Sequence, residues 1–475
     1  MDRKLIADMH CPYCAGSFKI ARESQGDEKR IRYGLLECRC FQFPIVDGVL
    51  LLSLNKGYGG AEEALQPYVP MQMAAIQHLQ KDDVPGLLAW MRRHVPLAAE
   101  LIEGRAGAYM PFYARMNHTL EIAESEFLAD ALRYEVIGFK RKLYELRKWV
   151  RRLNLRKTDT GSLLGTYFIS RFFAPRVNTL AMQLGQLPLD GRILSLCCGQ
   201  GIFENLVAAD ARNKEMVCLD GQFLNLLITR KYVAPNASLI CHDVQFPLPF
   251  NDGAFDGVFS STCMPEIPAQ RTFAREAIRV TNDSGWTFFD SVWAIANGVK
   301  RLDPRRHYRF CQNFFTRIED YVPFFESCLV AGRDVAIDIP AMPSEYYGAP
   351  RWISGTARHA AIAEGKDTEI SALITNPSKF KGFTSAKRDW LTAQHLAVSP
   401  VFETARENNG IRLTLRAQFA NPSIDFAAKS FKGYPQSVVL ESAKAKDQAW
   451  VEEQFNNGLL ALLPKHFDDA VQRLN

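Results

Sequence analysis

The sequence predicts an α/β protein whose central part is a doubly wound sheet, with smaller modules before and after it. From residue 187 onward, apolar strands alternate with helices, and the first strand runs into a glycine turn at Cys198-Gly-Gln-Gly201. A strand, a tight glycine turn and a helix form the first unit of such a fold, whose ligands bind beyond the carboxyl ends of the strands. In addition, four cysteines cluster between Cys11 and Cys40, which indicates a separate metal-stapled module.

Length and composition set the broad class of the protein. A chain of 475 residues is too long for one hydrophobic core, so we expect two to four domains. The net charge of +5 is small for this length and does not by itself indicate a nucleic-acid partner. The first ten residues are too polar for a secretory signal, and no apolar run approaches the ~18 residues of a membrane span. We therefore expect a cytoplasmic protein without an integral membrane segment.

The clustered cysteines predict a structural zinc site. A Cys-x-x-Cys pair and a Cys-x-Cys pair, separated by 23 residues, supply four thiolates: Cys11, Cys14, Cys38 and Cys40. Short strands expected at residues 18–20 and 33–36, with a hairpin tip at 25–30, would bring the two pairs together. Four thiolates give the tetrahedral cage that zinc prefers and leave no open position for a substrate. A module of about 55 residues is small enough to need such a staple.

The segment from Leu36 to Leu52 resembles the Trm112-like zinc ribbons. Members of that family show a Cys-x-x-Cys, a second cysteine pair and then a run like Phe43-Pro-Ile-Val-Asp-Gly48. The resemblance covers residues 5–54 and implies a zinc ribbon at 1–55; small members of the family activate tRNA, rRNA and release-factor methyltransferases. The second pair, Cys38 and Cys40, has one intervening residue where the usual Cys-x-x-Cys has two, which forms a tighter loop. His10 is therefore an alternative ligand in place of one cysteine. A site that has lost its metal is the other alternative.

Residues 56–185 are predicted to form a helical region. Apolar side chains recur at helical spacing at Leu87, Leu88, Met91, Val95 and Leu101, and again over residues 120–128. A stretch at 140–157 carries many lysines and arginines on one face and an apolar stripe on another. Such a basic helix can bind RNA phosphates or an anionic membrane surface. The alternative is a solvated face above a stripe that packs on the next domain.

The order of elements predicts the core at residues 186–376. We expect a first helix at 202–207 and a second at 273–280. The expected strands lie at 192–198, 215–220, 237–241, about 255–259, 286–293, 333–339 and 369–375. An insertion at 340–367 could contribute to a substrate lid. The extension at 377–475 has no assigned role; we expect one strand at 411–415 and a final helix at 448–463.

Four motifs in this region, in the right order, resemble class I methyltransferases of the small-molecule type, and the resemblance spans residues 190–295. The matching segments are Ile193–Gly201, Asp220, Asp243 with Leu248–Asp256, and Glu276 with Arg279 and Val280. The resemblance implies a Rossmann-like seven-stranded core that binds S-adenosylmethionine. Gly199 and Gly201 would flank the methionine part of the cofactor, Asp220 would hold the ribose, and Asp243 with Val244 would receive the adenine. The implied cofactor-binding set is Ser195, Cys197, Gly199, Gly201, Asp220, Asp243 and Val244.

Two positions depart from the family pattern. Ser195 stands where the family has an acid on the first strand, and Cys197 stands where it has the first glycine. The first change removes a partner for the ammonium group of the cofactor, and the second narrows the loop, so a low affinity is expected. A hydride-transferring dinucleotide enzyme fits less well, because position 204 is glutamate where that class has its third glycine.

The catalytic residues remain open on the sequence alone. Methyl transfer depends chiefly on alignment of acceptor and methyl carbon, and the acceptor would lie beyond the fourth strand, near residues 260–266. Glu266 is a candidate base, with an exposed loop acid as the alternative, and Cys263 is a candidate nucleophile. We expect a small-molecule or modified-peptide acceptor. The alternatives are an RNA base methyltransferase acting on rRNA or tRNA and a non-catalytic scaffold that binds S-adenosylmethionine.

Overall fold

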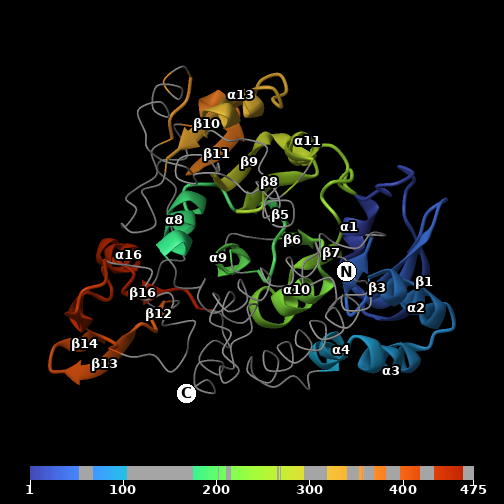
Figure 1. Ribbon diagram of the computed structural model, residues 1–475, viewed down its shortest axis with the longest axis horizontal. Coiled ribbons are helices and arrows are strands. Elements are labelled where there is room, and N and C mark those ends of the chain that lie inside the picture. The colour runs from blue at the N-terminus through green and yellow to red at the C-terminus, as the bar shows by residue number, and fades with distance from the viewer. Residues whose placement is uncertain are drawn as a thin grey trace, which may run out of the picture.

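The computed structural model of this protein describes most of the two ends and the core of the chain. The described residues are 1–52, 68–103, 175–201, 203–209, 215–264, 267, 269–293, 318–339, 352–355, 357, 369–380, 396–417 and 433–463. Within them, one large mixed sheet runs through the molecule, with helices on both of its faces (Figure 1). The predicted α/β fold is confirmed.

The large sheet has eleven strands in a single hydrogen-bonded order. That order is β1 (Lys19–Gly26), β2 (Ile31–Glu37), β3 (Gln42–Val46), β4 (Val49–Leu51), β7 (Ser238–Cys241), β6 (Glu215–Asp220), β5 (Arg192–Leu196), β8 (Phe255–Ser261), β9 (Thr281–Trp293), β11 (Glu369–Thr375) and β10 (Asp334–Asp338). Neighbouring strands from β4 to β9 in this order pair in parallel, whereas β11 is antiparallel to both β9 and β10. The carboxyl ends of β5, β6, β7, β8 and β9 therefore share one edge of the sheet.

The cysteine-bearing N-terminal module is part of this sheet. β4 pairs in parallel with β7, with Leu50 opposite Ile240, and the N–H of Leu52 continues the ladder to the carbonyl of Cys241 at 2.9 Å. The guanidinium of Arg192 also lies 2.6 Å from a carboxylate oxygen of Asp8. Main-chain bonds between two segments that are far apart in the sequence thus fix the position of the module relative to the core.

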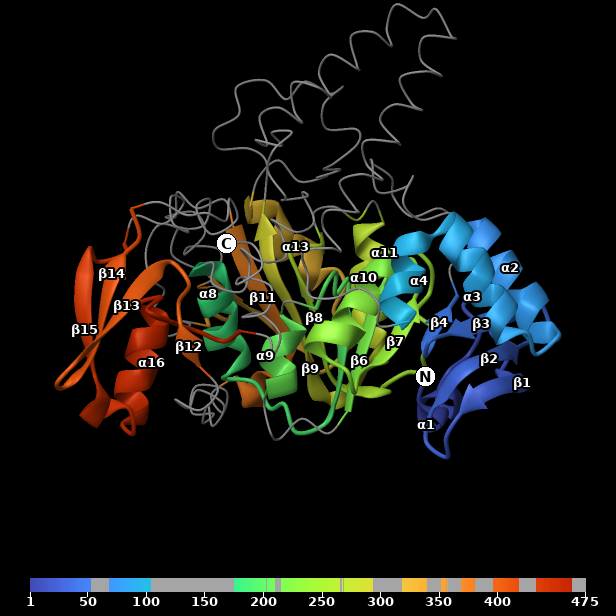
Figure 2. The same ribbon diagram turned by 90° about the horizontal axis from the view of Figure 1, so that it is seen from below.

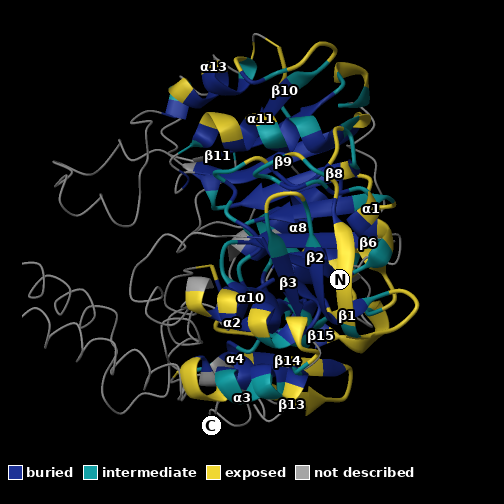
Figure 3. Ribbon diagram, turned by 90° about the vertical axis from the view of Figure 1, so that its right-hand side faces the viewer, coloured by how far each residue is buried: buried dark blue, intermediate teal, exposed yellow. Residues whose placement is uncertain are grey.

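Helices cover both faces of the sheet. The α-helices of the described residues are α1 (Arg3–Ala7), α2 (Tyr68–Gln80), α3 (Val84–His94), α4 (Pro96–Glu103), α8 (Pro175–Leu184), α9 (Glu204–Ala209), α10 (Phe223–Ile228) with a π-helical turn at Thr229–Val233, α11 (Gln270–Val280), α13 (Tyr321–Glu326) and, in the C-terminal extension, α16 (Gln448–Asn456). Most strands are buried, while the outer faces of several helices and much of β1 are exposed (Figure 3). This burial from both sides is what a parallel sheet requires. None of the helices among the described residues has the length and hydropathy needed to span a bilayer.

The helical region agrees with the expectation in part. Leu87 and Met91 are fully buried in α3, as their spacing predicts. The expected run from Leu87 to Leu101 is not one helix, because α3 ends at His94 and α4 begins at Pro96. A residue before proline is disfavoured in the helical conformation, and Val95 accordingly has a φ of −140° and a ψ of 58°. The expected helices at 120–128 and 140–157 lie outside the described residues.

Three expectations for the ends of elements are wrong. The first core helix begins at Glu204 and not at residue 202, because the turn continues through Gly201, whose φ is +76°. The expected tip of the first hairpin overlaps β1, which extends to Gly26. The final helix ends at Asn456 and not at residue 463: Gly458, with a φ of +67°, follows the cap and stops it.

The C-terminal extension contains more strands than expected. β13 (Phe402–Glu407), β14 (Gly410–Leu415) and β15 (Ser437–Glu441) form an antiparallel sheet, and β12 (Ala397–Val398) pairs with β16 (Leu460–Ala461). Together with α16, this small sheet lies at the opposite end of the molecule from β1–β4 (Figure 2). Its strands show little apolar alternation; β13, for example, is exposed at every position after Phe402.

Candidate cofactor and metal sites

The turn after β5 is held to the end of β6 by Asp220. The carboxylate of Asp220 accepts hydrogen bonds of 2.8 Å from the backbone N–H of Gly199 and of 2.8 Å from that of Gln222. The Asp220 residue is only 6% exposed. The side-chain amide of Asn225 also lies 3.5 Å from Oδ1 of Asp220. The expected contact of Asp220 with ribose hydroxyls stays a prediction.

The two glycines of the turn have different roles. Both have positive φ, +55° at Gly199 and +76° at Gly201, a region that side chains disfavour. A Cβ on Gly201 would lie 2.7 Å from the side-chain methyl of Thr229, so Gly201 allows the turn to pack closely on the π-helical turn. A Cβ on Gly199 would meet no atom of the described residues within 4 Å, so these residues leave open space beside the turn. A Cβ on Gly221, after β6, would likewise touch only the His242 carbonyl, at 4.0 Å.

The end of β7 continues this edge of the sheet. The backbone N–H of His242 donates to the carbonyl of Asp220 at 3.0 Å, which joins the two strand ends. The partly exposed carboxylate of Asp243 accepts from the backbone of Gln245 at 3.0 Å, and Val244 is buried. His242 is fully buried; burial lowers the pKa of its imidazole to about 4, so the ring is neutral near pH 7. The structure thus brings Asp220, Asp243 and Val244 to one edge.

Ser195, in the place of the expected strand acid, contacts an acid on the following helix. Its hydroxyl donates to Oε1 of Glu204, and both residues are only 1% exposed. The second oxygen of Glu204 has no hydrogen-bond partner within the described part of the chain. Burial raises the pKa of Glu204 to about 7, although the hydrogen bond from Ser195 opposes the shift. From the sequence, Glu204 was considered only because it stands where dinucleotide-binding enzymes have a third glycine. It was not predicted to be a site residue.

Cys197 and Cys263 meet beside the glycine turn. The hydrogen bond with the thiol of Cys263, together with burial, raises the pKa of the Cys197 thiol well above its ordinary value. The backbone has a positive φ in the segment after β5 and in the segment after β8, with +57° at Cys197 and +61° at Thr262. The candidate Cys263 therefore lies near the predicted cofactor residues. The other candidate, Glu266, lies outside the described residues.

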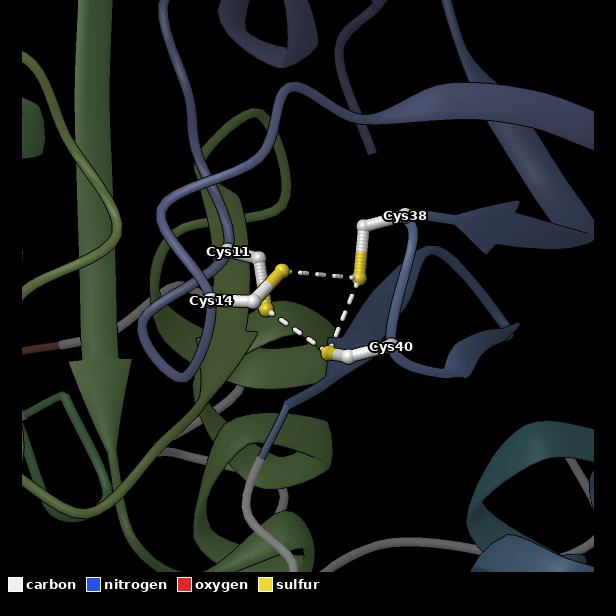
Figure 4. Close-up of side chains that lie close together, drawn as sticks. All are labelled: Cys11, Cys14, Cys38 and Cys40. Carbon is white, nitrogen blue, oxygen red and sulfur yellow. Dashed lines mark hydrogen bonds between the residues drawn. The ribbon is translucent and has the colours of Figure 1, made fainter.

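The four N-terminal cysteines form one cluster (Figure 4). Their sulfur atoms all lie within 4.8 Å of one another; three of the distances are 3.2 Å for Cys38–Cys40, 3.6 Å for Cys11–Cys40 and 3.7 Å for Cys14–Cys38. Zinc–sulfur bonds of ~2.3 Å in a tetrahedron place the sulfurs about 3.8 Å apart, so the spacing fits zinc. Both thiols of the Cys-x-Cys pair, Cys38 and Cys40, belong to the cluster. His10 is engaged elsewhere, with its Nδ1 3.3 Å from Oδ1 of Asn251.

The thiols of this cluster differ in acidity. A hydrogen bond from the backbone of Gly16 lowers the pKa of the Cys14 thiol to about 6. Burial and the neighbouring thiols raise the pKa of Cys40. A divalent cation would favour the thiolate form of all four, because metal binding releases protons from its ligands.

Residues 193–285 match a family model described as a methyltransferase domain. The match covers the glycine turn, Asp220, Asp243 and the segment around Glu276, which are the motifs singled out in the sequence. The predicted methyltransferase is confirmed, and its class, the S-adenosylmethionine-dependent methyltransferases, implies that cofactor. No curated protein matches the chain.

Several solved structures are similar to part of the chain. A SAM-dependent methyltransferase of Thermotoga maritima, described as a possible histamine N-methyltransferase, is 16% identical with a TM-score of 0.31; the match covers 50% of this chain and 98% of that one. A SAM-dependent methyltransferase of Aquifex aeolicus is 13% identical with a TM-score of 0.28, covering 43% and 89%. A complex that contains the Haloferax volcanii Trm112 methyltransferase activator gives 18% identity and a TM-score of 0.31, covering 42% and 89%. The assignment of the domain rests on the family model and not on these weak likenesses.

Proposed function

We propose that this methyltransferase binds S-adenosylmethionine beyond the carboxyl ends of β5, β6 and β7 and transfers its methyl group to a small-molecule or modified-peptide acceptor. The observation that carries the proposal is the open space beside Gly199 and Gly221, with the carboxylate of Asp220 between the two turns. Ligands of doubly wound sheets bind at this edge, where the backbone can be approached closely.

The residues at this edge fit the parts of the cofactor. Asp220 would accept the ribose hydroxyls, because its carboxylate stands at the carboxyl end of β6, next to the backbone of the turn at Gly199. Asp243 and Val244, at the end of β7, would receive the adenine amine and ring. The turn from Ser195 to Gly201 would surround the methionine part.

The reaction needs little acid–base chemistry from the protein. When bound, S-adenosylmethionine supplies a methyl group activated by its sulfonium sulfur. The chain contributes alignment of the acceptor, which can account for much of the rate. The raised pKa keeps the Cys197 thiol protonated near pH 7, and because thiolates are the nucleophilic form, Cys197 does not compete with the acceptor. Cys263, at the end of β8, remains a candidate contact of the acceptor.

The cysteine cluster is proposed to hold one structural zinc ion. Four thiolates at the observed spacing complete a tetrahedron, so the ion would have no position left for a substrate. The ion would tie the loop at Cys11–Cys14 to the loop at Cys38–Cys40, at the base of the strands that join β7 through β4. We accordingly divide the chain into a Trm112-like zinc ribbon (1–55), a helical region (56–185), the methyltransferase domain (186–376) and a C-terminal extension (377–475).

An RNA base is the second acceptor class, favoured by the zinc module and by the lysine- and arginine-rich stretch at 140–157. The two classes separate in one experiment, in which the protein is incubated with methyl-labelled S-adenosylmethionine and fractionated cell extract. Label in the small-molecule or peptide fraction is the expected result, and label in rRNA or tRNA would support the second class. The Asp220→Ala variant is the control and should transfer little label to any fraction. Bound cofactor without any transfer would support a non-catalytic scaffold.

A further inference from the structure

We propose that Glu204 and Gln200 bind the α-amino acid end of the cofactor, and that Glu204 supplies from the helix the acid that the first strand lacks. This inference rests on the proposed function, since it assigns one part of the same site. Glu204 is the first residue of α9 and follows the glycine turn directly. Its side chain reaches back to β5, where Oε1 accepts the hydroxyl hydrogen of Ser195.

Three side-chain atoms of this short segment are buried without a partner in the described chain. They are Oε2 of Glu204 and both Nε2 and Oε1 of Gln200. Glu204 is 1% and Gln200 is 2% exposed, so water does not easily satisfy them. Buried polar atoms in folded proteins are bonded in the large majority of cases, because leaving one unsatisfied destabilises the fold. Three such atoms on the side chains of one short segment, Gln200 and Glu204, therefore point to a ligand.

The chemical types of these atoms define that ligand. Oε1 of Gln200 can only accept from the ligand and Nε2 of Gln200 can only donate, and Oε2 of Glu204 can only accept when the carboxylate is ionised. An α-amino acid zwitterion presents the complement, because its ammonium donates and its carboxylate accepts. The methionine part of S-adenosylmethionine is such a zwitterion. The open space beside Gly199, the neighbour of Gln200, leaves room for it.

The charge of the site also favours the binding of an ammonium group. The nearby carboxylate of Asp220 disfavours the ionised form of Glu204, as does its burial. A buried carboxylate without a cation is costly, whereas an adjacent ammonium stabilises its charged form. Binding of the ammonium would thus satisfy both the hydrogen-bonding capacity and the charge of Glu204.

The test compares two ligands that differ only at this end. S-adenosylhomocysteine carries the amino acid, whereas 5′-methylthioadenosine has the same nucleoside and a thioether but no amino acid. Calorimetry with the full chain should show that Glu204→Gln weakens S-adenosylhomocysteine at least tenfold and 5′-methylthioadenosine less than twofold. Gln200→Leu should show the same selectivity with a smaller loss. The double variant S195D/E204Q, which returns the acid to the strand, should recover part of the affinity for S-adenosylhomocysteine.

Glu215→Gln is the matched control. Glu215 also uses one oxygen, in an ion pair of 2.9 Å with Arg192, while its other oxygen is buried without a partner among the described residues; it lies at the far end of β6 from the turn. Neither ligand should bind this variant differently from the wild type. If Glu204→Gln fails to fold, Ser195→Ala keeps the acid but removes its orienting bond, and should weaken S-adenosylhomocysteine selectively by about threefold.

Equal losses for both ligands, or no loss for either, would overturn this inference and leave the proposed function intact. Failure of the wild-type protein to bind either ligand would overturn the proposed function as well. Binding of 5′-methylthioadenosine as tightly as S-adenosylhomocysteine by the wild type would also overturn the inference, because the amino acid end would then contribute nothing.

Discussion

The carboxylate of Asp220 accepts a hydrogen bond of 2.8 Å from the backbone N–H of Gly199, so one side chain at the end of β6 fixes the turn after β5. The other oxygen of Asp220 accepts a hydrogen bond of 2.8 Å from the backbone N–H of Gln222, the residue that precedes α10. Asp220 therefore determines the shape of the turn and would also contact the cofactor.

Replacement of Asp220 should weaken cofactor binding strongly. Asp220→Ala removes two backbone anchors and the proposed ribose contact, and hydrogen bonds to charged groups contribute roughly 1.5–3 kcal/mol each. We expect at least about a tenfold loss of affinity, since 1.4 kcal/mol corresponds to a factor of ten. Asp243→Ala should cost less, because Asp243 would meet only the adenine. Glu403→Ala, on the exposed β13, is the control and should bind like the wild type.

Metal analysis of the purified protein should find one zinc ion per chain. Cys11→Ser or Cys38→Ser should abolish zinc binding and loosen the N-terminal module, because such a small module depends on its staple. Limited proteolysis would detect the change, and cofactor binding should be largely retained. Cys328→Ala, which removes a buried thiol outside the cluster, should keep its zinc. A protein without zinc, in which all four thiols react freely, would contradict the prediction.

Glu204 should make the stability of the core dependent on pH. Its pKa is raised from 4.5 to about 7 by burial, so the protonated form stabilises the fold at acidic pH, and this contribution is lost as the pH rises through about 7. A shift of this size corresponds to about 3 kcal/mol. Thermal unfolding without cofactor should therefore show Glu204→Gln more stable than the wild type at pH 8, with a smaller difference at pH 5. A difference that does not change with pH would contradict the prediction.

The basic stretch at 140–157 should be dispensable if the acceptor is small. Replacement of Arg147, Lys148, Arg151 and Arg152 by Gln should then change turnover little. If the acceptor is RNA, the same variant should lose RNA binding, and the loss should depend on salt because phosphate contacts weaken steeply as salt rises. Filter binding at two salt concentrations distinguishes the two results.

The strands buried on both sides could be predicted closely from the sequence. The expected bounds of β6 (Glu215–Asp220) and β11 (Glu369–Thr375) agree with the structure. Strands of this kind are almost continuously apolar, so the first and last residues of the apolar run mark the ends of the strand. In the C-terminal extension, the strand expected at 411–415 corresponds to β14 (Gly410–Leu415), but the other strands were missed. One of them, β13, is largely exposed and charged and has no apolar pattern to detect.

Long-range partners could not be predicted. Nothing local in the segment Val49–Leu51 indicates that it pairs with β7, which follows much later in the chain. The acid at Glu204 was missed as a site residue because a glutamate in the first turn of a helix normally serves the helix N-terminus. Only the contact with Ser195, across the strand and the helix, shows that its carboxyl is buried.

S-adenosylmethionine is proposed to bind at the edge of the sheet formed by β5, β6 and β7. The most direct measurement is a calorimetric titration of the intact, zinc-loaded protein with S-adenosylhomocysteine, with the Asp220→Ala variant alongside. We expect binding of one molecule per chain to the wild type and at least about tenfold weaker binding to the variant. Absence of binding to the wild type, with or without candidate acceptors, or equal affinity of the two proteins, would contradict the proposal.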